Sequence, residues 1–112
     1  MDGAEAPMAH GLSDLHIAVI SGQADRVLKI LTQRNKNALV NSGDADGATP
    51  LMTAVLTGRL TIAHLLLRNG GSPRVRDRRG YQASDYSKAS FFKTKFDIYK
   101  RLGLPEPADG SA

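Results

Sequence analysis

The stretch Asp46-Gly-Ala-Thr-Pro-Leu-Met-Thr-Ala-Val-Leu-Thr-Gly58 has the pattern of one turn followed by one short helix. Gly47 suits the turn, and Thr49 is a residue type that caps a helix by accepting a backbone hydrogen bond. Pro50 fits the first helical position, where no amide hydrogen is needed. Gly58 tolerates the left-handed conformation that commonly ends a helix. The stretch therefore predicts a helix that begins at Pro50 and stops at Gly58.

A second apolar run follows, from Ile62 to Leu67, and Gly70-Gly71 ends it. The block from Gly47 thus encodes turn, helix, turn and helix in 33 residues. It resembles an ankyrin repeat, whose signature contains Thr-Pro-Leu-His-x-Ala at this period. Met52 stands where the family has histidine. The resemblance implies an all-α solenoid of stacked helix-turn-helix units with short hairpin fingers between them.

An earlier copy of the pattern begins at Gly11, which lies 36 residues before Gly47. Ser13 takes the capping place, and Gly22 stops the first helix as Gly58 does in the central block. The period is three residues longer than in the central block, and the extra residues fall within 34–38. We expect either one more turn on the second helix or a longer surface loop, which costs little closure entropy.

A later, degraded copy begins at Asp77-Arg-Arg-Gly80, and its apolar residues Phe92, Phe96, Tyr99 and Leu102 follow helical spacing. This copy would close the array, because a terminal repeat needs a polar outer face. We predict a flexible leader over 1–10, an ankyrin-repeat domain over 11–103 and a flexible tail over 104–112. The repeats would span about 11–46, 47–79 and 80–103.

Composition excludes several classes of protein. A chain of 112 residues has room for one small domain, and the absence of cysteine removes disulfides, thiolate metal sites and thiol nucleophiles. No apolar run approaches the roughly 20 residues that span a bilayer, and residues 1–10 lack the pattern of a signal peptide. We expect no membrane insertion and an intracellular location, cytoplasmic or nuclear.

No residue pattern indicates catalysis, a metal or a cofactor. His10, His16 and His64 include no pair at metal-ligand spacing on one helix face. Ser13, Asp14 and His16 are packed into one helix start and cannot face one another as a catalytic triad does. By resemblance, His16 matches the family's histidine, which hydrogen-bonds the backbone of a neighbouring loop. We therefore predict that the chain is not an enzyme.

The resemblance implies a groove that binds other proteins, lined by fingers and by the inner faces of first helices. Four large inner-face residues lie off the stripe that packs the helices, so we expect them to form an exposed apolar patch. The alternative is that the leader or tail folds over them, or that they pack with finger residues. By position, the inner-face places are Ile17, Ile20, Ser21, Thr53, Leu56, Thr57, Tyr86, Ala89 and Ser90, of which the four large ones are Ile17, Ile20, Leu56 and Tyr86.

The two fingers differ in charge. Residues 1–50 carry four Lys/Arg and six Asp/Glu, for a net −2, whereas residues 51–112 carry eleven and five, for +6. The first finger contains Asp44 and is acidic; the second contains Arg76, Arg78 and Arg79 and is basic. Arginines grip carboxylates or phosphates through paired hydrogen bonds. The alternative is that these arginines are solvated and pair with Asp77.

The predicted function is a non-catalytic protein–protein interaction module that binds a partner through its groove and fingers. The partner would offer apolar anchors and an acidic flank. One alternative is binding of nucleic acid or another acidic ligand through the basic finger and the C-terminal helix, which predicts strong salt dependence. A second alternative is an architectural role in which the apolar patch forms a homodimer.

Overall fold

The computed structural model describes residues 11–34, 36–88, 100 and 103. The first repeat contributes α1 (Asp14–Ile20), α2 (Ala24–Leu31) and α3 (Lys36–Val40). The second contributes α4 (Pro50–Leu56) and α5 (Leu60–Arg68), and a 3-10 helix, η3 (Ala83–Ser87), follows. The predicted leader and tail, and most of the predicted C-terminal helix, lie outside the described residues.

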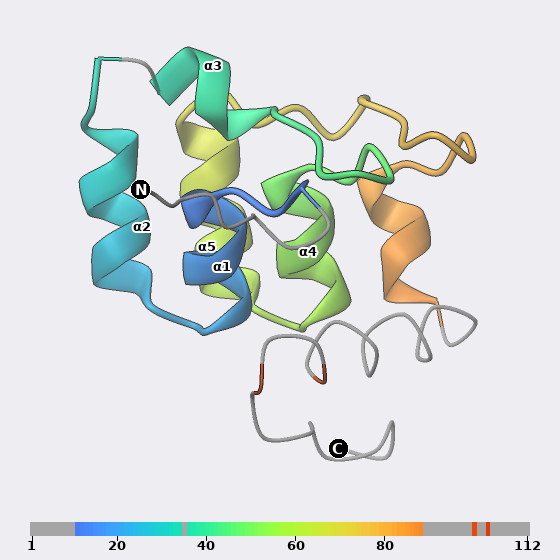
Figure 1. Ribbon diagram of the computed structural model, residues 1–112, viewed down its shortest axis with the longest axis horizontal. Helices are drawn as coiled ribbons and strands as arrows, with labels where there is room; N and C mark the ends of the chain where they lie inside the picture. Colours follow the sequence, from blue (N-terminus) through green and yellow to red (C-terminus); the bar gives the residue numbers. More distant parts are fainter. Residues whose placement is uncertain (1–10, 35, 89–99, 101–102, 104–112) are drawn as a thin grey trace, which may run out of the picture.

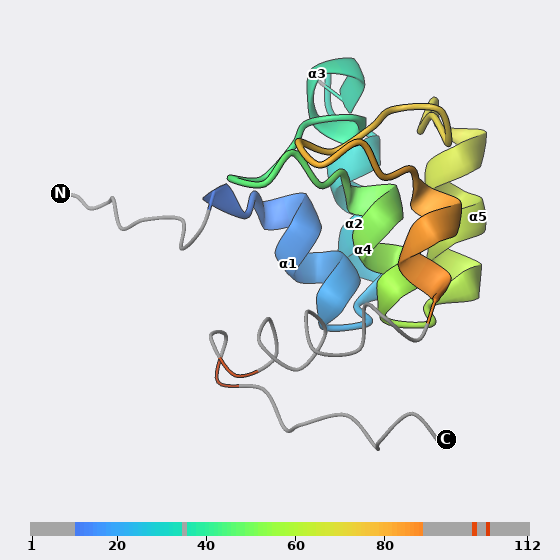
Figure 2. The same ribbon diagram turned by 90° about the vertical axis from the view of Figure 1, so that its right-hand side faces the viewer.

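The helices stack in two rows (Figures 1 and 2). One row contains α1, α4 and η3, and α4 contacts both of its neighbours. The other row contains α2 and α5, which also contact each other. The described residues contain no β-strand, so each finger is a tight turn projecting between helix pairs. This arrangement confirms the predicted all-α solenoid.

The predicted caps begin the first helix of each of the first two repeats. Ser13 Oγ accepts from the His16 amide at 3.2 Å, and Thr49 Oγ1 accepts from the Met52 amide at 3.3 Å. Pro50 occupies the first turn of α4, as predicted. Each hydroxyl satisfies an amide that has no partner within its helix.

The predicted glycine stops are Schellman motifs. After α4, the Arg59 amide donates to Ala54 O at 2.8 Å and the Gly58 amide donates to Val55 O at 3.1 Å. Gly58 itself has φ +71°. The same pair of hydrogen bonds closes α1 at Gly22 and α5 at Gly70. Glycine is needed because a side chain disfavours this left-handed conformation.

The three extra residues of the first repeat form neither of the predicted structures. The helix α2 ends at Leu31, and a separate short helix, α3, begins at Lys36. Val40, the last residue of α3, is buried in the core. The insertion therefore adds a new helix to the repeat, held in place because Val40 contributes apolar burial.

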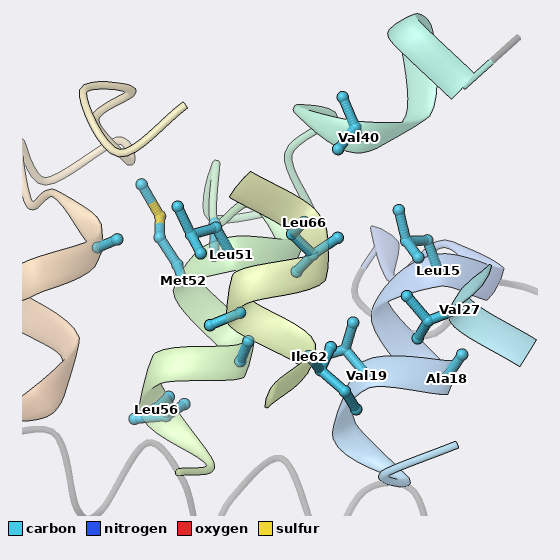
Figure 3. Packing of buried hydrophobic residues seen from close by; sticks show 14 of the residues in the cluster. Leu15, Ala18, Val19, Val27, Val40, Leu51, Met52, Leu56, Ile62 and Leu66 are labelled. Carbon is cyan, nitrogen blue, oxygen red and sulfur yellow. The ribbon is translucent and has the colours of Figure 1, made fainter. Parts of the chain in front are cut away.

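The core lies between the two rows and is almost entirely aliphatic (Figure 3). Ala18 and Ala54 are fully buried where their helices meet, and such small side chains let helices approach closely. Larger side chains fill the space around them; they include Leu15, Val19, Val27, Leu51, Met52, Ile62 and Leu66.

Candidate functional site

Finger 1, residues 43–48, is a turn built by its own aspartate. Asp44 Oδ1 accepts from the Asp46 amide at 2.8 Å and from the Ala48 amide at 2.9 Å. The Gly47 amide donates to Asp44 O at 2.9 Å. Asp44 was predicted as a contact residue, but this geometry gives its carboxylate a structural role in shaping the turn.

Finger 2, residues 74–81, repeats the same turn 33 residues later. Asp77 Oδ1 accepts from the Arg79 amide at 2.8 Å and from the Tyr81 amide at 2.9 Å. The Gly80 amide donates to Asp77 O at 3.0 Å. Both fingers are therefore preformed by equivalent aspartates and need no partner to acquire their shape.

Finger 1 is fastened to α1 by a buried histidine. His16 Nε2 lies 2.8 Å from Ala48 O, and Nδ1 accepts from the Ser13 amide at 3.2 Å. The predicted role of His16 as a backbone-binding residue is therefore confirmed. Burial lowers the pKa of His16, although the hydrogen bond to Ala48 and the charge of Asp44 act in the opposite direction. The imidazole is neutral and carries its proton on Nε2.

Finger 2 is fastened differently, because Met52 occupies the place of the histidine. The Tyr86 hydroxyl donates to Asp77 Oδ2 at 2.5 Å, and Arg79 Nη2 reaches the same oxygen at 3.2 Å. Burial alone would raise the pKa of Asp77, but these bonds and two backbone amides lower it. Burial, with the neighbouring carboxylate, raises the pKa of Tyr86 above its ordinary value of 10.0. Asp77 is therefore a buried carboxylate paired on both oxygens.

The prediction that the large inner-face residues form an exposed apolar patch is wrong. Ile20, Leu56 and Tyr86 are each at most 7% exposed, and only Ile17 is half-buried. Leu56 and Tyr86 belong to the buried core, where α4 packs against both α1 and η3.

The two threonines of the inner face are also buried, and their hydroxyls bind helix carbonyls. Thr53 Oγ1 donates to Pro50 O at 2.7 Å, and Thr57 Oγ1 donates to Thr53 O at the same distance. Such local bonds satisfy a buried hydroxyl without any external partner. Ser21 is half-buried, and Ala89 and Ser90 lie outside the described residues.

Both fingers carry exposed charged side chains. Arg74, Arg76 and Arg78 are exposed on finger 2, and Asp46 is exposed on finger 1. The Arg78 amide donates to Asp46 O at 2.9 Å, which holds the two fingers side by side. Arg76 Nη1 donates to Gly80 O at 2.8 Å and so follows the turn of its own finger.

Arg79 differs from the other finger arginines. Besides its ion pair with Asp77, its guanidinium lies 5.1 Å from the centre of the Tyr81 ring. For Arg79 the alternative interpretation, pairing with Asp77, holds. The sequence did not predict that Tyr86 completes this network from another element.

Two exposed leucines were not anticipated. Leu60 and Leu67 lie on α5 outside its buried stripe of Ile62, Ala63 and Leu66. Their sequence signal is weak, because a single leucine beside a core stripe usually needs no explanation. Asn41 was also missed: its side chain binds Gly70 O and the Ser72 amide and so joins the two repeats.

Within the described part of the chain, no three His, Cys, Asp or Glu residues are grouped to hold a metal ion. No described helix is long and apolar enough to cross a membrane.

Comparison with known proteins places these features in one family. A family model described as ankyrin repeats in three copies matches residues 3–77. The chain is 38% identical over 76 residues to the E3 ubiquitin-protein ligase KEG of Arabidopsis thaliana, a match covering 68% of this chain. It is 33% identical over 76 residues to the probable palmitoyltransferase AKR2 of Saccharomyces uvarum, covering 65% of this chain. It is 40% identical over 58 residues to Inversin of Danio rerio, covering 52%.

These relatives are much longer proteins. The matched segments span 5% of KEG and Inversin and 10% of AKR2. The similarity therefore concerns the repeats and does not extend to the rest of those proteins. From the family match, the paired helices and the turn-forming fingers, we conclude that this chain belongs to the ankyrin-repeat family.

Proposed function

We propose that this chain is a non-catalytic protein-recognition module whose main contact surface is the pair of fingers. The observation that carries the proposal is the exposure of Arg74, Arg76 and Arg78 on one preformed finger, beside the acidic tip of the other. Ankyrin repeats in general are non-catalytic protein-interaction modules, which supports the same class of function.

The partner would be a polypeptide with an acidic segment. Guanidinium groups form paired hydrogen bonds with carboxylates, and a preformed turn keeps the ordering cost of binding low. Opposite charges on adjacent fingers would also orient the partner as it approaches. Apolar anchoring in the groove would be minor, because Ile17 alone among the large inner-face residues remains half-exposed.

Nucleic acid is a second candidate ligand because of the same run of arginines. Tyr81 is exposed close to Arg79, and an aromatic ring beside a cation can stack with a base. Binding of this kind would be insensitive to sequence and would fall steeply with salt.

The test is affinity capture from a native lysate, followed by direct titration of the captured partner. Arg76→Glu/Arg78→Glu should lose the partner, while Arg26→Glu/Lys29→Glu should retain it. The control makes the same change of charge on exposed residues of α2, far from the fingers. Equal capture by both variants would refute the finger surface. Tight, salt-sensitive binding of a random RNA, with no protein captured, would favour the second candidate.

A further inference from the structure

Two residues with a hydroxyl group directly precede a proline in this chain, and they differ in burial. Thr49, before Pro50, is 1% exposed, and its hydroxyl caps α4. Ser72, before Pro73, lies in the coil between α5 and finger 2 (Figure 1). Ser72 is half-buried and Pro73 is exposed. Of the two pairs, the second is therefore the one that another protein can reach from solvent.

The segment from Ser72 to Arg76 is held in place by few interactions. Within the described chain, none of its backbone amides or carbonyls bonds to another backbone group. The Ser72 amide donates to Asn41 Oδ1 at 2.8 Å, and Gln82 Nε2 donates to Arg74 O at 3.5 Å. A kinase binds its substrate as an extended segment, and this segment can extend without the loss of any helix, because such local opening costs little.

The Ser72 hydroxyl is available for reaction. Its Oγ accepts from the Arg74 amide at 3.2 Å in a solvent-exposed hydrogen bond, and it donates to no described residue. A phosphate ester keeps acceptor oxygens at this position, so the Arg74 amide retains a partner. The bond to Asn41 comes from the Ser72 main chain and does not involve the hydroxyl. Phosphorylation therefore leaves the hydrogen bonds of Ser72 intact.

We propose that Ser72 is phosphorylated by a proline-directed protein kinase, which selects a serine or threonine followed by proline. In the reaction, Ser72 Oγ attacks the γ-phosphorus of ATP and forms the new oxygen–phosphorus bond. The bond from that phosphorus to the bridging oxygen breaks and ADP leaves, while the hydroxyl proton passes to the catalytic base of the kinase. The phosphate adds about two negative charges at neutral pH.

The phosphate stands at the start of the basic finger and changes its charge. Residues 74–81 carry four arginines and one aspartate, for a net +3. A phosphate on Ser72, two residues before Arg74, lowers the local sum to about +1. An acidic partner then meets less attraction, because a phosphate of the same chain competes for the finger arginines. This effect on binding rests on the proposed function, whereas the phosphorylation site does not.

Incubation of the whole chain with a purified proline-directed kinase and ATP tests the site. Intact-mass spectrometry should show one added phosphate, and fragmentation should locate it at Ser72 and not at Thr49. Ser72→Ala and Pro73→Ala should both stay unmodified, with the helical circular dichroism spectrum of the wild type. Pro73→Ala keeps the hydroxyl and therefore tests whether the motif is recognised. No phosphate at Ser72, or equal incorporation in Pro73→Ala, would overturn the proposal.

The effect on binding is measured by titration with a fluorescent oligoglutamate peptide as the acidic probe. Phosphorylation of Ser72 should weaken binding by about tenfold or more at low salt, and the difference should shrink as salt screens the charges. Ser72→Ala treated with kinase should bind as the untreated wild type does. Equal affinity of the two forms would refute the regulatory effect but not the finger surface. If neither form binds, the finger surface itself is refuted, and the phosphate at Ser72 is then a modification without this effect.

Discussion

His16 Nε2 donates a hydrogen bond to Ala48 O at 2.8 Å, across 32 residues of sequence. Its Nδ1 accepts from the Ser13 amide at the start of α1. One imidazole therefore holds the first helix and finger 1 together. Only the neutral ring with its proton on Nε2 can serve both partners, because a protonated ring has no acceptor.

We expect the free energy of unfolding to fall as the pH drops below 6.5, the ordinary pKa of histidine. Burial lowers the pKa of His16, so the unfolded chain takes up a proton at a higher pH than the folded chain. Stability therefore increases with pH through this window and is lost as the pH falls towards the folded-state pKa. Urea unfolding at a series of pH values measures how steeply the free energy of unfolding changes with pH.

His16→Met is the control for this pH dependence. It removes the titrating group but keeps an acceptor sulfur, as Met52 does for the Thr49 amide at 3.3 Å. The part of the slope due to His16 should disappear, while the slope due to carboxylates remains. An unchanged slope would show that another group is responsible.

The reverse exchange, Met52→His, should stabilise the protein by about 1 kcal/mol, the net worth of one hydrogen bond. The two fingers share the same turn, so Tyr81 O stands in the place of Ala48 O. Met52→Leu should fall below the wild type, because the Thr49 amide loses its sulfur acceptor. The urea midpoint should be highest for the histidine variant, intermediate for the wild type and lowest for the leucine variant. A histidine variant with a lower midpoint than the leucine variant would contradict this.

Asp77→Asn should lower the free energy of unfolding by about 1.5–3 kcal/mol, and Asp44→Asn should lower it clearly less. Asparagine keeps an oxygen for the turn amides in both fingers. At Asp77, however, it loses the buried charge that accepts from Tyr86 and Arg79. Chemical denaturation of the two variants at neutral pH makes the comparison. Equal losses would mean that the Tyr86 network adds nothing to stability.

The same carboxylate has a pH signature. The pKa of Asp77 lies below its ordinary value of 3.8, because its hydrogen bonds outweigh burial. Its contribution is therefore complete above that value and is lost as the pH falls through the folded-state pKa. In Tyr86→Phe the loss of stability at low pH should be smaller, because one of the hydrogen bonds that lower the pKa of Asp77 is gone. If Tyr86→Phe loses as much stability at low pH as the wild type does, the Tyr86 hydrogen bond does not contribute to the lowered pKa of Asp77.

Gly22→Ala should destabilise the fold more than Gly58→Ala, although both glycines have φ +71°. Each substitution costs about 1–2 kcal/mol for the left-handed backbone. At Gly22 the new methyl would also lie 2.8 Å from Arg59 Cζ, whereas no described atom lies within 4 Å at Gly58. Thermal unfolding of both variants measures the difference.

Arg59 supplies the control for the glycine pair. Its Nη2 donates to Ile20 O at 3.1 Å, so the guanidinium is held against the end of α1. In an Arg59→Ala background the clash is gone, and the extra cost of Gly22→Ala should vanish. If the extra cost persists, it arises from the backbone and not from the arginine.

The chain alone determined the local features of this fold. Ser13 and Thr49 cap helices, and Gly22, Gly58 and Gly70 end them, through bonds to residues within a few positions of each other. These interactions depend on residue type and spacing, so the sequence pattern predicts them. The role of His16 followed from the same pattern by resemblance.

Only the tertiary structure decided which faces are covered. Leu56 and Tyr86 were expected to be exposed and are buried, whereas Leu67 belongs to an apolar run and is exposed. The fate of each side chain depends on whether another helix packs on its face, and that neighbour comes from a distant part of the chain. Asp77 became a buried, fully paired carboxylate for the same reason, since Tyr86 reaches it from η3. Burial is a property of packed pairs of elements, and periodicity within one element cannot contain it.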